Sequence, residues 1–241
     1  MTSYALYLES GPKRRKTMVH ILHPDLVGCV AAGPTTEDAL AAVSEAIAAY
    51  RRFLHRHGEP IDLDAPYSTH IAEHIIVGGM LGEGSPYIMF GPDHGSATDA
   101  DFIRTLARSR ALREEFATWT NSRPDAALDA PPPSGSRTAR AILLHVLGAT
   151  GPNLSGALAT APGFSALHGS AARAELPIPV ALRRSSEMIA ARLAESTPEQ
   201  RSAVRDLPAG PRTLRKALRQ LLEHDWTHLV ELSRFPDGPA V

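Results

Sequence analysis

This sequence of 241 residues has one cysteine, few aromatic residues and almost no net charge. Its single cysteine, Cys29, excludes an internal disulfide framework and every structural zinc site that needs two to four thiolates. Lys and Arg together number 25 against 26 for Asp and Glu, so the net charge of -1 provides no overall cationic field for nucleic acid or anionic lipid. Any metal site in this chain must therefore use histidine or carboxylate ligands.

Long apolar runs are missing as well. No stretch approaches the roughly 18 apolar residues of a membrane-spanning helix, and residues 1–16 lack the apolar core of a secretory signal. Apolar residues nevertheless make up 43% of the chain, enough to bury two hydrophobic cores. We therefore expect a two-domain cytoplasmic protein without membrane or nucleic-acid partners, for which a homodimer remains open.

The N-terminal third of the chain has the pattern of a small β-sheet. Alternating apolar residues between Tyr4 and Leu8 are followed by a basic turn and by a stretch rich in strand-forming residues, which predicts a hairpin. Two further stretches of strand-forming residues predict two more strands. The expected strands lie at residues 4–8, 17–22, 28–32 and 71–77.

One amphipathic helix is expected between the third and fourth strands. Thr35 and the acidic residues after it form an N-cap signature. Apolar residues from Leu40 to Leu54 recur at steps of three and four, which is the period of one helix face. Gly58 stands where a left-handed residue would end the helix, so the predicted helix covers residues 36–57.

Three short motifs precede this helix. They are Pro24-Asp25-Leu26, Gly28-Cys29 and Gly33-Pro34-Thr35-Thr36-Glu37-Asp38-Ala39-Leu40. In this order they make residues 1–80 resemble the HicB-like domains, which have a small sheet packed on a helix. In toxin-antitoxin systems such a domain neutralises an mRNA-cleaving partner while a separate C-terminal reader binds the operator. Because the C-terminal part of this chain does not resemble such a reader, the resemblance implies a fold and a binding role rather than an antitoxin.

The pattern becomes helical after a Gly- and Pro-rich linker at residues 81–97. Four stretches carry a helical apolar period, and four helices imply a bundle. We place Pro211 in the first turn of the last helix, and we expect residues 148–165, rich in Gly and Pro, to form a loop. The expected helices lie at residues 99–119, 137–148, 179–194 and 211–233.

Three histidines of this region are candidate metal ligands. His224 and His228 continue the apolar face of the last helix, and their i, i+4 separation sets the two imidazoles about 6 Å apart along the helix axis. His145 interrupts an apolar run of the second helix, so we expect it near or within the core. Each imidazole could separately bond a backbone carbonyl, a carboxylate or water, but three converging imidazoles are satisfied together by one divalent ion.

The same residues give a second resemblance. Members of the DinB-like four-helix superfamily place one histidine on the second helix and a His-x-x-x-His pair on the last helix around a divalent metal. His145, His224 and His228 match these positions, with Thr213-Leu214-Arg215-Lys216 and Glu223-His224-Asp225-Trp226 in the expected neighbourhood. The resemblance covers residues 98–236. It implies a metal with open coordination sites and, in several branches, an enzyme that uses a low-molecular-weight thiol.

Other candidate residues are assigned structural or solvated roles. Cys29 is expected to be a buried small hydrophobe rather than a nucleophile. His70 and His74 fall in a strand, where residues four apart are separated by about 13 Å and cannot share an ion. Glu223 and Asp225 are either partners of the metal ligands or surface charges, and the helical wheel favours the surface. Further residues expected at the surface or in strands are His20, His23, His55, His57, His94, His168 and the basic turn Lys13-Arg14-Arg15-Lys16.

The sequence therefore predicts an α+β protein with a HicB-like domain at residues 1–80 and a DinB-like bundle at residues 98–236. The leading function is a metal-dependent transferase or hydrolase that acts on a small molecule with a thiol cosubstrate. Three imidazoles suit zinc, nickel, iron or copper, and no catalytic side chain is assigned. The alternative is a non-catalytic binding or regulatory module, of the antitoxin type, with a structural or vestigial metal.

Overall fold

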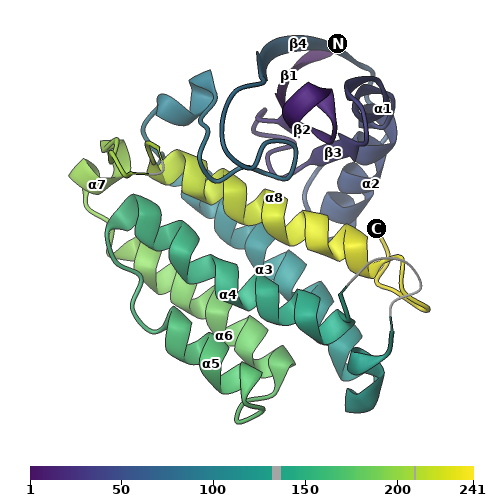
Figure 1. The fold of residues 1–241 in the computed structure, drawn as a ribbon, viewed down its shortest axis with the longest axis vertical. Coiled ribbons are helices and arrows are strands. Elements are labelled where there is room, and N and C mark those ends of the chain that lie inside the picture. The colour runs from purple at the N-terminus through teal and green to yellow at the C-terminus, as the bar shows by residue number, and fades with distance from the viewer. Residues whose placement is uncertain (132–136, 209) are drawn as a thin grey trace.

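The computed structural model describes residues 1–131, 137–208 and 210–241, and it has the mixed α+β fold that the sequence predicts (Figure 1). A four-stranded sheet has the strand order β3-β2-β1-β4. β1 pairs antiparallel with β2, β2 pairs antiparallel with β3, and β4 runs parallel to β1. The strands are β1 (Thr2–Ser10), β2 (Thr17–Ile21), β3 (Val30–Gly33) and β4 (Tyr67–Ile75).

Both faces of the central hairpin are covered. Leu8 lies opposite Val19 in the register, and both belong to the largest apolar core. The neighbouring positions point to the other face because strand side chains alternate. There Glu9 and His20 are buried polar residues. The hairpin prediction is confirmed, and its polar face turns toward α8 (Leu214–Leu232) and the segment after β4.

Two helices cover the apolar face of the sheet, α1 (Thr36–Ala41) and α2 (Val43–Arg56). The Thr35 hydroxyl accepts a hydrogen bond from the backbone N–H of Asp38, so the predicted N-cap is confirmed. The single helix expected at residues 36–57 is interrupted at Ala42, whose N–H is shared between the carbonyls of Asp38 and Leu40. This tightens one turn without changing the apolar face.

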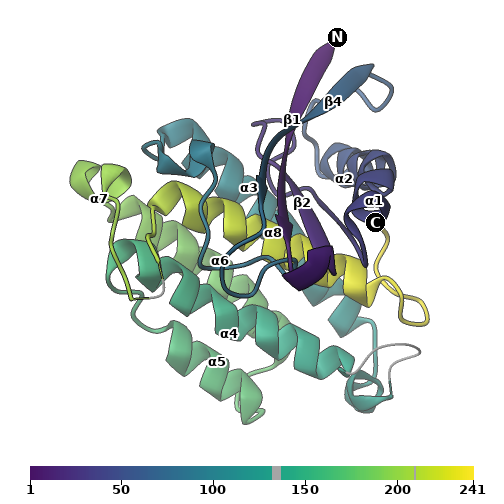
Figure 2. The ribbon, with the colours of Figure 1, turned by 45° about the horizontal axis from the view of Figure 1, so that its top comes forward.

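The remaining helices form the larger half of the molecule (Figure 2). The longest helix is α3 (Asp99–Asn121). α8 crosses the middle of the molecule, with the sheet on one side and most helices of this half on the opposite side. The other helices are α4 (Ala139–Leu158), α5 (Phe164–Ala172), α6 (Ile178–Ala194) and α7 (Pro198–Ser202), and the 3-10 turns are η1 (Pro12–Arg14), η2 (Gly91–His94) and η3 (Asp125–Asp129).

One apolar cluster joins the sheet to the helices. Trp226 of α8 lies 4.9 Å from the ring of Tyr50 and 5.3 Å from that of Phe53, both on α2. Arg108 of α3 adds a polar link, because its guanidinium donates to the carbonyl of Val27 and pairs with the Glu59 carboxylate at 2.6 Å. α8 is buried on several sides, since Lys216, Glu223 and Asp225 are buried as well as Trp226.

The sequence prediction for the second bundle helix is wrong at its end. We expected residues 137–148 to be helical and residues 148–165 to form a loop, but α4 continues to Leu158 and includes Pro152. The extension buries Leu154 and Leu158 in a second apolar cluster with α6 and α8. Burial of these side chains outweighs the low helix propensity of glycine and proline.

The start of the last helix also differs from the prediction. Pro211 is not in its first turn, since α8 begins at Leu214 with Thr213 as the N-cap residue. The backbone of Arg212 instead forms an isolated antiparallel bridge with Arg205. This bridge holds residue 212 in an extended conformation and delays the helix.

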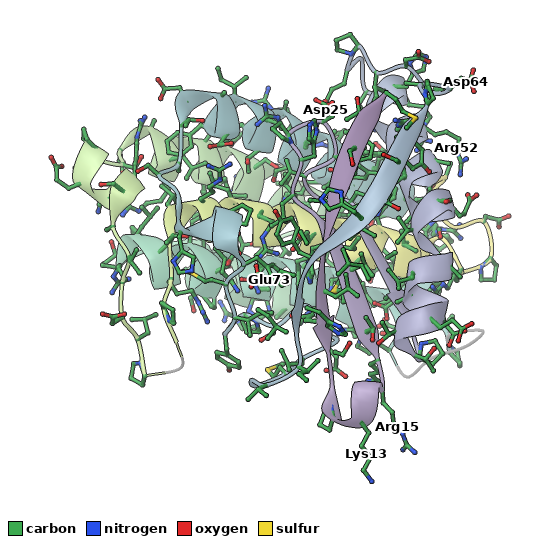
Figure 3. All side chains as sticks on the ribbon, turned by 90° about the horizontal axis from the view of Figure 1, so that it is seen from above. Lys13, Arg15, Asp25, Arg52, Asp64 and Glu73 are labelled. Carbon is green, nitrogen blue, oxygen red and sulfur yellow. The ribbon has the colours of Figure 1, made fainter. Side chains whose placement is uncertain are left out.

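The basic turn behaves as a solvated hairpin tip. Lys13 and Arg15 project from the end of the β1–β2 hairpin, away from the rest of the protein (Figure 3).

Part of the Ala- and Pro-rich stretch 125–136 forms η3, and residues 132–136 lie outside the described residues. Among the described helices, only α4 is long and apolar enough to cross a membrane, and half of it is buried inside the protein.

Candidate metal centre

Three imidazoles from two helices converge beside α8. His145 comes from α4, and His224 and His228 come from successive turns of α8. One nitrogen from each ring lies within 4.8 Å of the others, and the Nε2 atoms of His145 and His224 are 3.0 Å apart. Ligand nitrogens around a tetrahedral ion are about 3.3 Å apart, given bonds of about 2.0–2.1 Å. The three side chains therefore fit one divalent ion with small adjustments.

The cluster lies at a cavity wall rather than inside the bundle core. His228 is 7% exposed, His224 is partly exposed and His145 is exposed, so of the two positions expected for His145, near the core or within it, the second is wrong. The helix carries this side chain into a cavity of about 900 Å³ between the sheet, α8 and the segment after β4. An ion held here would keep open coordination positions on the cavity side.

Two of the three imidazoles, His145 and His228, have a lowered pKa. Although His145 has solvent on its cavity side, desolvation by the protein atoms around its ring, followed by the neighbouring His224 and His228, lowers its pKa to about 4. Burial also lowers the pKa of His228, against the opposing effect of the Glu231 carboxylate. Neutral imidazoles keep a free lone pair, which is what a metal ligand requires.

A carboxylate orients His228. Its Nδ1 lies 2.8 Å from Oε2 of Glu231, and Arg137 donates to the same oxygen at 2.6 Å. With Nδ1 bound in this way, Nε2 is the nitrogen left for an ion. Such a carboxylate–histidine contact fixes the tautomer and the ring orientation of metal ligands.

Asp225 is not the surface charge that the helical wheel favoured. It is fully buried and pairs with Arg113 of α3 at 3.0 Å, while its other oxygen lies 3.5 Å from Nδ1 of His224. Burial alone would raise the pKa of Asp225, but Arg113 and His224 hold it below its ordinary value. The wheel assumed one buried face, whereas α8 is covered on several sides.

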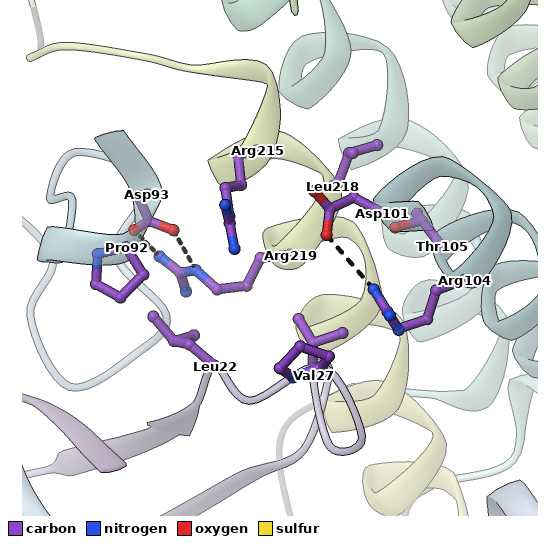
Figure 4. Close-up of a pocket in the computed structure, with 11 residues that line it drawn as sticks. Leu22, Val27, Pro92, Asp93, Asp101, Arg104, Thr105, Arg215, Leu218 and Arg219 are labelled. Carbon is purple, nitrogen blue, oxygen red and sulfur yellow. Dashed lines mark hydrogen bonds and ion pairs between the residues drawn. The ribbon is translucent and has the colours of Figure 1, made fainter. Parts of the chain in front are cut away.

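Glu223 is buried as well, on the side of α8 that faces the sheet. It pairs with Arg219 at 2.6 Å, and its other oxygen lies 3.1 Å from Nδ1 of His20. Arg219 also binds both oxygens of Asp93 in η2, as Figure 4 shows at a smaller neighbouring cavity. Of the two positions expected for His20, at the surface or in a strand, the strand is confirmed, and its side chain is buried. No periodicity in the sequence could have paired these residues, which come from three distant segments.

The segment after β4 forms the roof of the cavity. The Glu9 carboxylate accepts hydrogen bonds from the backbone N–H groups of Gly82, Gly84 and Ser85. Lys216 of α8 is fully buried and donates its amine to the carbonyls of Ser85 and Ile88. The sheet and α8 therefore both fix this segment over the histidines.

The other histidines do not join the cluster. His70 and His74 lie on β4, where they contact the hydroxyls of Ser3 and Ser10. His57 pairs with Glu115 at the surface. Cys29 is buried, and burial raises the pKa of its thiol, so the expectation of an inert hydrophobic side chain agrees with its environment.

Comparisons with protein families, with curated protein sequences and with solved structures find no match to this chain. The chemistry proposed for the site therefore rests on its own geometry.

Proposed function

We propose that the chain binds one divalent metal ion through His145, His224 and His228 and uses it as a transferase or hydrolase. In this proposal residues 98–236 are a DinB-like bundle and residues 1–80 a HicB-like domain. The substrate is a small molecule, and a low-molecular-weight thiol serves as cosubstrate. The observation that carries the proposal is the convergence of three imidazoles at the wall of an open cavity.

The donor set supports activation of a thiol or of water. An ion with three neutral ligands keeps its full positive charge and lowers the pKa of a bound thiol or water. The protein's part is to orient His228 through the Glu231 carboxylate and to place the Asp225 carboxylate 3.5 Å from Nδ1 of His224. The only thiol of the chain, Cys29, is buried, so a thiol nucleophile would come from the cosubstrate.

An open site favours catalysis over a purely structural ion. Structural zinc sites are usually closed by four protein ligands, whereas catalytic sites keep a position for water or substrate. His145 is exposed at the cavity wall, and only three His, Cys, Asp or Glu side chains of the described residues form the cluster. This arrangement supports the enzyme over the non-catalytic module.

Metal content measured by mass spectrometry tests the proposal. We expect about one zinc, nickel or iron ion per chain in the wild type and a loss of at least tenfold in occupancy for His228→Ala. His94→Ala, a surface histidine outside the cluster, is the matched control and should keep its metal. Equal metal content in the wild type and His228→Ala would end the proposal.

A further inference from the structure

We propose that a groove between α4 and α8 binds a small organic anion whose acidic group pairs with Arg212. The proposal deepens the function above by naming the substrate class, and it rests on that function only for the end of the ligand that reaches the metal. The chemistry shared by the candidate ligands is an apolar body with a carboxylate or phosphate at one end.

The groove is a second cavity, of about 400 Å³, that shares His145 and His224 with the first. This volume lies within the range of small-molecule sites. Its walls are mainly apolar, with a larger apolar than polar surface. The apolar contributors are Met80, Pro86 and Tyr87 of the roof, Ala149 and Pro152 of α4, and Leu221 of α8.

Arg212 has a guanidinium without a carboxylate partner. The residue as a whole is 8% exposed, and among the residues that the structure describes no Asp or Glu lies within ion-pair distance of it. By contrast, the buried Arg113 and Arg219 each pair with a carboxylate, and the buried Arg51 donates to three acceptors, the carbonyls of Leu63 and Ala65 and the hydroxyl of Tyr4. The Arg212 guanidinium donates instead to the carbonyl of Pro211 at 3.1 Å. A charge with little access to water and no counterion is unfavourable, and an anionic ligand in the groove would offset that cost.

The guanidinium is held in place before any ligand arrives. The backbone N–H of Arg212 donates to the carbonyl of Arg205 at 2.9 Å, and the carbonyl of Arg212 accepts from Arg205 at 2.8 Å. The guanidinium carbon lies 5.6 Å from the centre of the Tyr87 ring. A side chain fixed by its backbone and by an aromatic ring loses little freedom on binding an anion.

The two ends of the groove differ in chemistry, which gives a bound ligand a direction. α8 starts at Leu214, and ten further residues to His224 correspond to about 15 Å along the helix axis. The roof carboxylate of Glu83 also lines the groove, but it is already paired with Lys16. An acid bound at Arg212 would therefore lie along the apolar wall with its far end toward the histidines.

Calorimetric titration with three eight-carbon probes tests this inference: octanoate, octyl phosphate and neutral octanol. We expect at least one of the two anions to bind the wild type and to lose about tenfold or more in affinity for Arg212→Gln, since hydrogen bonds to charged groups are the stronger class. Arg215→Gln removes the same charge three residues away, outside the groove, and should bind like the wild type. The affinity for octanol should be the same in the wild type, Arg212→Gln and Arg215→Gln.

Ala149→Glu provides a second test that leaves Arg212 intact, for the case in which Arg212→Gln does not fold. An added carboxylate on the α4 wall should weaken anion binding by about tenfold through repulsion or by occupying Arg212. The same titrations on His228→Ala separate this inference from the metal proposal, because anion binding there should persist without metal. Unchanged anion affinity in Arg212→Gln or in Ala149→Glu, or no anion binding to the wild type, would overturn the inference.

Discussion

The pKa of the buried Lys216 amine depends strongly on its surroundings. Burial, helped by the charge of Arg219 and opposed by Asp93, lowers its pKa from 10.5 to about 7. Its amine nevertheless has two acceptors, the carbonyls of Ser85 and Ile88. A neutral amine still has two N–H donors for them, so the roof segment can stay attached when the proton is lost.

This lowered pKa predicts how stability changes with pH. Between pH 7 and 10.5 the unfolded chain holds a proton on Lys216 that the folded chain has lost, so raising the pH stabilises the fold. We expect the free energy of unfolding of the wild type to rise relative to Lys216→Met by about 1 kcal/mol per pH unit between pH 7 and 9. Urea unfolding at several pH values measures this slope. Lys13→Met, at the exposed hairpin tip, should follow the wild type, and a parallel course for Lys216→Met would contradict the assignment.

At the same scale, the sequence predicts the three clustered histidines better than the residues that surround them. His224 and His228 are visible because two histidines four residues apart share a helix face, and His145 because it breaks an apolar run. Glu223 and Asp225 could not be assigned in this way. Their partners His20 and Arg113 are brought to α8 by the tertiary fold, which leaves no spacing signal in the sequence.

Among the elements, α4 carries most of the difference between expectation and structure. Helical periods predict α3, α6 and most of α8 because each has a long apolar repeat without interruption. In α4 the residues Gly148 to Pro152 interrupt the repeat, and tertiary burial of the next two turns decides the outcome. Local propensity is a weak guide where an element is held by its neighbours.

Two glycines of α4 should respond in opposite ways to a single added methyl group. A Cβ at Gly151 would lie 2.8 Å from the Cβ of Phe164, so Gly151→Ala forces α4 and α5 apart and should cost about 1–3 kcal/mol. A Cβ at Gly156 would lie 3.7 Å from its nearest neighbour in Arg212, so Gly156→Ala should be neutral or stabilise by about 0.5 kcal/mol. Thermal unfolding of the two variants decides this. Equal shifts would mean that the α4–α5 contact is not tight.

At the scale of the whole molecule, the sheet and the helices share one apolar core, which the two domains predicted from the sequence do not include. Composition and pattern divide the chain near residues 81–97, yet the largest apolar cluster includes residues from the strands, from α2 and from α8. The sequence shows which stretches are apolar but not that α8 presents Leu222 and Trp226 to the sheet half. That information lies in the angle at which α8 crosses the molecule.

The two halves should therefore unfold together. We expect a single transition in urea, with the same midpoint by tryptophan fluorescence and by far-ultraviolet circular dichroism. Trp226→Ala should lower the stability of both halves by about 3–5 kcal/mol because it leaves a cavity between α2 and α8. The remaining Trp119 in α3 reports on the helical half in that variant. Separate transitions in the wild type would show that the halves are energetically independent.

The unequal exposure of the three imidazoles also bears on how the protein would acquire its ion. His228 is anchored deep in the wall, whereas His145 stands at the open side, so an ion would arrive and depart past His145. Exchange of the ion with the solvent would then require only the His145 side chain to rotate away, while the other two histidines stay bound to the ion. Immobilised nickel could therefore load the site with nickel during purification, and a chelator could remove the native ion. The native metal is best identified in protein isolated without either.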